Sequence, residues 1–212
     1  MPDTKFLADP RHSNDIGAHC SPAEFVASYV SRLSDVLATV PAATIDRVAR
    51  VLADAAEERR RVFVLGNGGS AAIADHVCCD LLKGTWSVGH PPLDATSLNA
   101  NIALYTATAN DFGFERVFAR QIETLGNRGD VLIAISSSGN SENVLRAVSA
   151  AHAAGMTVIG LCGFEGGCLK EAADIVLHAA VSNYGLVEDS HMAWMHIVAQ
   201  MISCRRDGVA DW

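Results

Sequence analysis

A glycine-rich turn precedes a histidine and a carboxylate that are one helical turn apart in the stretch VFVLGNGGSAAIADHVCCD, residues 62–80. The turn consists of Gly66, Asn67, Gly68, Gly69 and Ser70. Glycines allow a sharp turn and a close ligand approach, and free N–H groups at the start of the following helix favour an anion. A plain strand-to-helix turn has the same composition. This loop alone therefore predicts either a phosphate site or a structural turn.

A dinucleotide site is a further interpretation of the same turn. Gly66, Gly68 and Ala71 match the pattern G-x-G-x-x-A loosely. That motif requires an acidic residue at the end of the next strand, whereas the aspartate of DATSL stands near the beginning of its strand. The dinucleotide interpretation is therefore the weaker one.

A cluster of serines marks a second loop, ISSSGNSENV, at residues 135–144. The serines around Gly139 are Ser136, Ser137, Ser138 and Ser141. Hydroxyl groups beside a helix N-terminus donate well to phosphate oxygens. Serines also cap helices, but a cap needs one serine and not four. The second loop thus predicts phosphate binding.

His76 and Asp80 are spaced i, i+4, which places both side chains on one helix face, where they can hold one ion together. An imidazole with a carboxylate suits zinc, although other divalent ions accept the same donors. Such a pair is also common on solvated helix surfaces. Its position directly behind an anion loop, together with a second set at Glu188 and His196, favours a metal site.

Short apolar segments alternate with helical ones over most of the chain. We expect strands at residues 61–66, 92–98, 130–136, 157–162 and 174–179. We expect helices at residues 21–40, 43–59, 69–83, 113–125, 141–154 and 186–205. This alternation predicts a parallel sheet covered on both faces. The expected fold class is α/β, a flavodoxin-like doubly wound sheet of five strands with N-terminal helices, in which ligands bind at the carboxyl ends of the strands.

The 212 residues have the length of one domain, which we place at residues 21–212 after a flexible leader at residues 1–20. Two amphipathic helices ahead of the first strand offer apolar surface to a partner subunit. The formal charge of −8 argues against nucleic acid or an anionic membrane as a partner. Six cysteines without a regular framework, with no secretory signal and no run of about 18 apolar residues, predict reduced thiols in a cytoplasmic protein.

The two loops, GNGGSAA and ISSSGNSENV, with ANDFGFERVFARQIE between them, resemble the sugar isomerase (SIS) domain family. More narrowly they are similar to the sedoheptulose 7-phosphate isomerases, over roughly residues 21–205. The resemblance implies a homotetramer of flavodoxin-like subunits with active sites shared between subunits. It also implies conversion of sedoheptulose 7-phosphate to D-glycero-D-manno-heptose 7-phosphate.

The resemblance further implies roles for individual residues. The family's substrate contacts fall on Asn67, Gly68, Gly69, Ser70, Asn110, Asp111, Ser136, Ser137, Ser138, Ser141 and Glu188. Its metal ligands fall on His76, Asp80, Glu188 and His196, and the expected divalent ion is zinc. Its base falls on Asp80 and its general acid on His196. Glu188 is a further candidate base that this sequence adds and the family lacks.

Two positions depart from the family pattern. Asp80 replaces a glutamate, which shortens the side chain by roughly 1.5 Å. Proton abstraction needs a reach of about 3 Å, so either the backbone shifts or the pocket differs. Glu188 replaces a glutamine, which adds a negative charge beside the ion and supplies an alternative base. We expect a changed substrate preference as one consequence.

The spacing of Glu188 and His196 constrains the site. They are eight residues apart, which is about 12 Å along a helix and about 80° around it. Either the helix starts after Glu188, or one site draws on two subunits. His191 lies between them and matches no family ligand, so we expect it in the core or behind the ligands.

Two classes of function fit these motifs. The first is a metal-assisted aldose–ketose isomerase. The second is a non-catalytic SIS tetramer of the DnaA initiator-associating type, which lacks the carboxylate and the last histidine. Asp80 and His196 favour the enzyme. A SIS sensor usually carries a DNA-binding or amidotransferase domain, which does not fit in 212 residues. The exact sugar, its anomer and the metal stay open.

Overall fold

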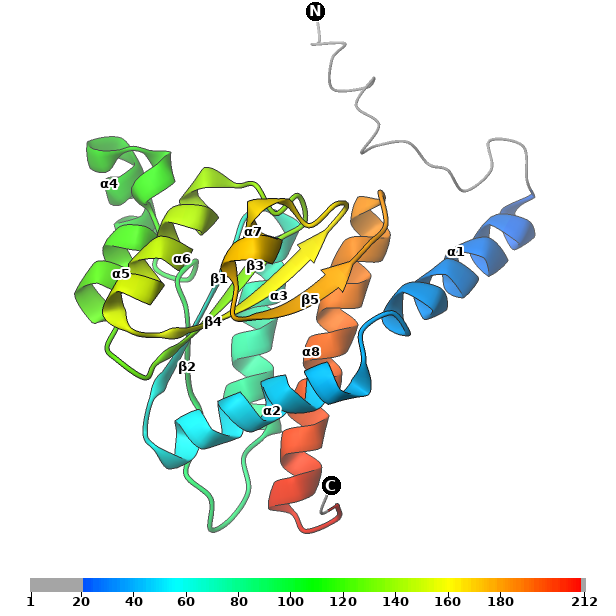
Figure 1. The fold of residues 1–212 in the computed structure, drawn as a ribbon, viewed down its shortest axis with the longest axis horizontal. Coiled ribbons are helices and arrows are strands. Elements are labelled where there is room, and N and C mark those ends of the chain that lie inside the picture. Colours follow the sequence, from blue (N-terminus) through cyan, green and yellow to red (C-terminus); the bar gives the residue numbers. More distant parts are fainter. Residues whose placement is uncertain (1–20, 211–212) are drawn as a thin grey trace, which may run out of the picture.

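The computed structural model describes residues 21–210, and the expected leader at residues 1–20 lies outside them. A parallel sheet of five strands forms the centre of the molecule (Figure 1). The strands are β1 (Arg61–Gly66), β2 (Asp94–Ser97), β3 (Val131–Ser136), β4 (Thr157–Gly163) and β5 (Ile175–Ala179). Their order is β2-β1-β3-β4-β5, which is the flavodoxin-like doubly wound order. The predicted fold class is confirmed.

Helices cover both faces of the sheet, because successive strand residues point to opposite sides. Val62 and Val64 pack under α2 (Ala42–Glu57), α3 (Gly69–Cys79) and α8 (Tyr184–Arg206). Phe63 and Leu65 pack under α5 (Ala119–Leu125), α6 (Glu142–Ala154) and α7 (Gly167–Ala172). The apolar run of β1 therefore belongs to a strand that is buried on both sides.

The predicted site lies between β1 and β3, where the order in which the chain adds strands to the sheet reverses. Gly66 pairs with Ile135, so the carboxyl ends of β1 and β3 are neighbours. From β1 the chain returns through α3 to β2 on one side, and from β3 it returns through α6 to β4 on the other. The two connections leave a crevice between them, which is where doubly wound folds bind ligands. Both predicted substrate loops begin at this crevice.

Two helices were missing from the expected elements, and one was placed wrongly. Residues 102–112 form α4 (Ile102–Phe112), although the segment has little amphipathic pattern. The short helix α7 was also not expected. The helix expected at residues 113–125 is interrupted: a turn of 3₁₀ helix, η3 (Phe114–Arg116), precedes α5. Gly113 has a φ of +92°, which ends α4 before that turn.

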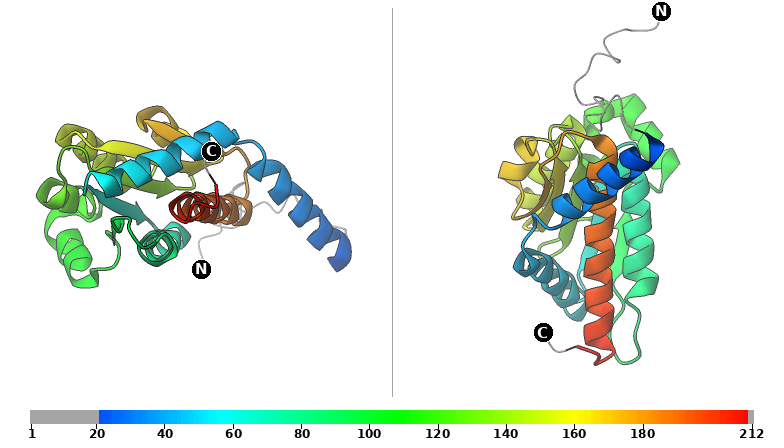
Figure 2. Two further views of the ribbon diagram at one scale, coloured as in Figure 1. Left: turned by 90° about the horizontal axis from the view of Figure 1, so that it is seen from below. Right: turned by 90° about the vertical axis from the view of Figure 1, so that its right-hand side faces the viewer.

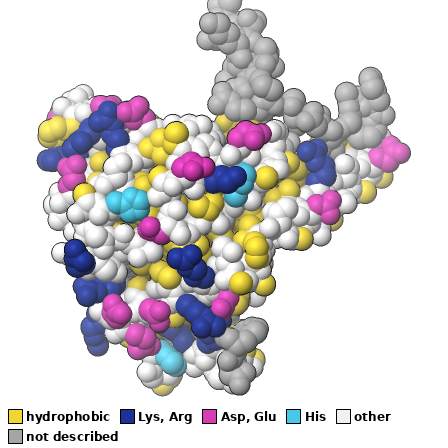
Figure 3. Space-filling view, in the orientation of Figure 1, with side chains coloured by type: hydrophobic (Ala, Val, Ile, Leu, Met, Phe, Trp, Pro, Cys, Tyr) yellow, Lys and Arg dark blue, Asp and Glu magenta, His cyan; other side chains and the backbone are white. Residues whose placement is uncertain are grey.

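Helix α1 (Pro22–Leu37) extends away from the body of the molecule as an arm (Figures 1 and 2). Within residues 22–37 the one buried side chain is Val36, while Phe25, Val26 and Val30 are exposed. Figure 3 shows hydrophobic side chains along this arm, and acidic and basic side chains intermixed over the visible face. The hydroxyl of Tyr29 donates to Asp189 Oδ2 at 2.6 Å, which joins the arm to α8.

The described cysteines are free thiols, and they form no disulfide within residues 21–210. Burial raises the pKa of Cys78 and of Cys162 to about 12, so both thiols stay protonated at neutral pH. None of the helices in this part of the chain has the length and apolar character needed to cross a membrane.

Candidate active site

The glycine loop after β1 is tightly folded. A Cβ atom at Gly66 would lie 2.6 Å from the carbonyl oxygen of Ser70, so a larger residue there would push the loop open. Gly68 precedes α3 with a φ of +55°, a conformation that glycine adopts without strain. The Asn99 side chain donates to Gly66 O at 2.8 Å and accepts from Gly66 N at 3.2 Å. The end of β2 thus holds the loop in place.

The serine loop after β3 lies next to the glycine loop, and its serines differ in how deeply they are buried. Ser136 and Ser137 are buried, and Ser136 Oγ is 3.2 Å from Ser141 Oγ. Ser141 is the N-cap residue of α6, but its side chain makes no capping hydrogen bond within the described residues. Ser137 Oγ is buried without a partner in the same part of the chain. Within the described residues, the Ser137 hydroxyl group therefore has no partner, and the Ser136 and Ser141 hydroxyl groups bond only to each other.

A turn from the neighbouring β4–α7 connection supports the serine loop from behind. Gly139 has a φ of +67°, and a Cβ atom there would collide with the carbonyl oxygen of Gly166. Gly163 N donates to Ser137 O at 2.8 Å, and Leu169 N donates to Gly139 O at 2.9 Å. Hydrogen bonds from the β4–α7 connection therefore fix the backbone of the serine loop.

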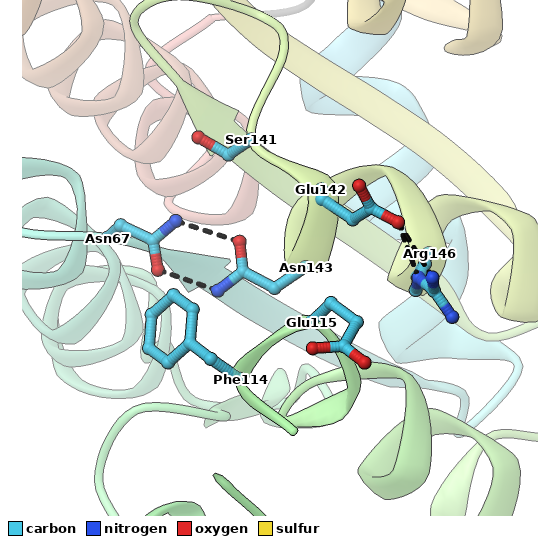
Figure 4. Close-up of a pocket in the computed structure, with 7 residues that line it drawn as sticks. All are labelled: Asn67, Phe114, Glu115, Ser141, Glu142, Asn143 and Arg146. Atoms are coloured by element: carbon cyan, nitrogen blue, oxygen red, sulfur yellow. Dashed lines mark hydrogen bonds and ion pairs between the residues drawn. The ribbon is translucent and has the colours of Figure 1, made fainter. Parts of the chain in front are cut away.

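A cavity of about 430 Å³ opens between the two loops and the α4–α5 connection. Figure 4 shows its lining residues, which are Asn67, Phe114, Glu115, Ser141, Glu142, Asn143 and Arg146. Asn67 and Asn143 bond to each other at its centre, with the Phe114 ring beside them. A second cavity of about 370 Å³ shares Asn67 and is bounded by Asn99 and Tyr105. Asn99, Phe114 and Asn143 were not predicted as site residues, because nothing in a single asparagine or phenylalanine marks it before the chain folds.

Asn110 and Asp111 lie on α4 and are exposed, and the Asn110 amide donates to Asp111 Oδ1 at 2.8 Å. Neither is among the residues that line the two cavities. Within the single chain, the structure therefore does not bring this predicted contact into the crevice, and their binding role stays a prediction.

His76, Asp80 and His196 form one compact group where α3 and α8 run side by side (Figure 2). His76 Nε2 and His196 Nε2 are 3.1 Å apart. Asp80 Oδ2 is 3.5 Å from His76 Nε2 and 3.2 Å from His196 Nε2. His76 and His196 are 120 positions apart in the sequence, and the packing of α8 against α3 brings them together.

This geometry fits a divalent ion. Ligand atoms about 2.0–2.2 Å from a tetrahedral zinc ion are separated by roughly 3.3–3.6 Å, and the three distances are 3.1, 3.2 and 3.5 Å. Asp80 Oδ2 is buried and accepts no hydrogen bond within residues 21–210, an arrangement that ordinarily carries a cost. A cation between the three atoms would satisfy the carboxylate and both ring nitrogens at once.

A π-helical turn, η2 (Asp80–Gly84), begins at Asp80. Thr85 N donates to Asp80 O at 3.1 Å, which is the i to i+5 bond of a π turn. The Asp80 side chain comes within 3.5 Å of both imidazoles although it lacks a methylene group relative to glutamate. Whether the backbone or the pocket compensates for the shorter side chain stays a prediction.

Glu188 does not belong to the group formed by the two histidines and Asp80 in the single chain. Its carboxylate lies against Gly69 at the start of α3, where a Cβ atom would collide with it. Burial raises the pKa of Glu188, and the charge of Asp189 raises it further. Helix α8 begins at Tyr184, close to the expected start at residue 186, which excludes the alternative in which the helix starts after Glu188. Glu188 and His196 therefore lie on one continuous helix, α8, which Figure 2 shows at its full length.

His191 lies in the core, as expected, with none of its surface exposed. Its Nε2 atom is 3.0 Å from the carbonyl oxygen of Cys162 at the end of β4. Burial lowers the pKa of His191 to about 4, and the charge of His178 adds to that effect. His191 is therefore neutral at physiological pH, and it contacts the end of β4 and does not belong to the group of His76, Asp80 and His196.

Comparison with known proteins agrees with this architecture. A model of the SIS domain matches residues 24–163, and the chain belongs to the SIS domain family. A curated phosphoheptose isomerase from Campylobacter concisus is 37% identical over 159 residues, which are 75% of this chain and 84% of the relative. Another from Helicobacter pylori is 40% identical over 152 residues, 72% of this chain and 79% of the relative.

A solved structure of a phosphoheptose isomerase from Francisella tularensis superimposes with a TM-score of 0.79 at 33% identity. The match covers 87% of this chain and 99% of that one. The chain is thus an aldose–ketose isomerase similar to the phosphoheptose isomerases, and the resemblance predicted from the two loops is confirmed.

Proposed function

We propose that the chain converts sedoheptulose 7-phosphate to D-glycero-D-manno-heptose 7-phosphate with the help of a divalent ion, most simply zinc. The observation that carries the proposal is the group of His76, Asp80 and His196, whose ligand atoms all lie within 4.8 Å of one another. The curated relatives named phosphoheptose isomerase support a seven-carbon sugar phosphate as the substrate.

The serine loop would bind the phosphate. The loop leads into the start of α6, where the helix dipole favours an anion, and the Ser137 hydroxyl group has no partner within the described residues. Asn67 and the glycine loop would contact hydroxyl groups of the sugar chain in the adjoining cavity. The phosphate would then anchor the substrate and leave its carbonyl end free to reach the acid–base groups.

The isomerisation moves two protons. A carboxylate, which we assign to Asp80, removes a proton from C1 and returns it to C2. His196 would relay the proton of the C1 hydroxyl group to the oxygen on C2 through the ring nitrogen that does not hold the ion, so that the ketose becomes an aldose without net loss of atoms. A divalent ion held by His76, Asp80 and His196 would stabilise the negative charge that develops on the two oxygens.

We further propose that each site uses two copies of the chain. His76, Asp80 and His196 come from one copy, whereas Glu188 lies at Gly69, seven residues from His76 and about 10 Å along α3. Glu188 of the same copy is therefore too far to complete the ion's ligands. Glu188 of a second copy would fill the fourth position. The exposed apolar side chains of the α1 arm support such an assembly, which we propose to be a homotetramer.

The test combines metal analysis with turnover. The purified protein should contain about one divalent ion per chain and should convert sedoheptulose 7-phosphate, and a chelator should remove both the ion and the activity. Full activity after complete removal of the ion would end the metal proposal. Absence of turnover with this sugar, at full metal content, would end the proposed substrate.

We also propose that the protein is located in the cytoplasm.

A further inference from the structure

One pair of side-chain amides joins the two substrate loops (Figure 4). Asn67 Nδ2 donates to Asn143 Oδ1 at 2.9 Å, and Asn143 Nδ2 donates to Asn67 Oδ1 at 2.9 Å. Asn67 belongs to the glycine loop after β1, and Asn143 belongs to the first turn of α6, 76 residues further along the chain. The pair therefore bridges the crevice at the point where the substrate would bind.

A further hydrogen bond fixes the orientation of this pair. Val144 N donates to Asn143 Oδ1 at 3.0 Å, so this atom must be the amide oxygen, because an NH₂ group cannot accept from a backbone N–H. Asn143 is only 2% exposed, so water does not compete for its amide. The fixed amide of Asn143 then fixes the amide of Asn67, since its oxygen must face a nitrogen and its nitrogen an oxygen.

Asn67 uses half of its hydrogen-bonding capacity in the pair. An amide has two N–H donors and two acceptor lone pairs, and Asn143 takes one of each. The second donor and the second lone pair have no partner among residues 21–210 and remain for a ligand. Asn67 lines both cavities of the crevice. A sugar hydroxyl group donates and accepts hydrogen bonds, so a donor and an acceptor held in known positions suit this class of ligand.

We propose that Asn143 is a positioning residue, which acts through Asn67 by presenting its amide in one orientation to a hydroxyl group of the sugar phosphate. The inference rests on the proposed function for the identity of the ligand. Without Asn143, the amide of Asn67 rotates about a broad terminal torsion, and half of its orientations exchange donor and acceptor. The glycine loop also loses its connection to α6.

A double-mutant cycle on binding tests this proposal. The proteins are the unaltered chain, Asn67→Ala, Asn143→Ala and the double variant. Calorimetric binding of sedoheptulose 7-phosphate should weaken about tenfold in Asn67→Ala and about fivefold in Asn143→Ala. The double variant should match Asn67→Ala within about twofold, because Asn143 has nothing left to position. Independent contributions would instead give about a fiftyfold loss, and that result would overturn the proposal.

Matched controls separate positioning from loosening of the loop. Asn140→Ala removes another asparagine of the serine loop, whose amide contacts Ser138 and Cys168 and not Asn67. It should leave binding within about twofold, and a loss equal to that of Asn143→Ala would contradict the proposal. If Asn143→Ala does not fold, Asn143→Asp keeps the volume and the bond from Val144 but cannot donate to Asn67. Asn140→Asp is then the control for the negative charge that Asn143→Asp introduces.

Turnover gives an independent readout. Asn143→Ala should raise KM by the factor seen in binding and leave kcat within about threefold, because the pair does not touch the reacting carbons. A selective fall in kcat would assign Asn143 to another role. Binding without turnover in the unaltered protein would overturn the proposed function and leave the binding cycle decisive for Asn143. No binding in the unaltered protein would overturn both.

Discussion

Mixing two inactive variants tests whether one site draws on two copies of the chain. Glu188→Ala removes the carboxylate that lies at Gly69, and His196→Ala removes a member of the group on α3 and α8. In a mixed assembly, a shared site is intact when its Glu188 comes from one variant and its His196 from the other. Random assembly from equal amounts gives that combination in about a quarter of the sites. A site contained in one chain would never be intact.

The assay uses chains with two different affinity tags, so that only mixed assemblies are isolated, followed by metal analysis and turnover of sedoheptulose 7-phosphate. We expect about a quarter of the activity of the unaltered protein. The matched control mixes His76→Ala with His196→Ala, whose side chains lie 3.1 Å apart in one chain. That mixture should stay inactive because no chain has both histidines. Activity in this control, or its absence in the first mixture, would refute the shared site.

Asp80→Asn should lower kcat by about 100-fold or more, because it removes the base, and should change substrate binding little, because the side chain keeps its shape. Steady-state kinetics measure both quantities. Activity equal to that of the unaltered protein would assign the base to Glu188. Ser138→Ala with Ser141→Ala should raise KM strongly, because we propose that these hydroxyl groups bind the phosphate, and should leave the melting temperature nearly unchanged, because both residues are only partly buried. Unchanged affinity would remove the serine loop from the site. His191 has a folded pKa of about 4, below its usual 6.5, so its contribution to stability is present above pH 6.5 and is lost as the pH falls towards 4. Urea unfolding should show that His191→Gln reduces this acid sensitivity by on the order of 3 kcal/mol, and an unchanged pH profile would contradict the assignment.

The group of two histidines and one carboxylate also bears on the choice between an enzyme and a non-catalytic SIS protein. A scaffold protein has no need for a buried carboxylate oxygen without a hydrogen bond, next to two ring nitrogens at 3.1 Å. The similarity to phosphoheptose isomerases points the same way. Glu188, where the resemblance predicts a glutamine, makes the substrate preference of this enzyme the property most worth measuring.

The sequence alone determined the five strands, most of the helices between them and the positions of the glycine loop and the serine loop. Apolar runs such as RVFVLG predict buried parallel strands because both of their faces are covered. Glycines and serines at strand ends predict anion loops because their backbone and hydroxyl groups act locally. Helix α4 was not predicted because apolar residues such as Ile102 and Leu104 are exposed, so its sequence lacks the periodic pattern of an amphipathic helix.

Tertiary structure decided what distant residues do together. The i, i+4 spacing brought His76 near Asp80, but only the packing of α8 against α3 placed His196 3.2 Å from that carboxylate. The same packing places Glu188 at Gly69 and away from the group of His76, Asp80 and His196, because eight residues of continuous helix separate Glu188 from His196. The Asn67–Asn143 pair likewise exists because β1 and β3 are neighbours. Local spacing encodes contacts within one element, whereas contacts between elements follow from the sheet order and from helix packing.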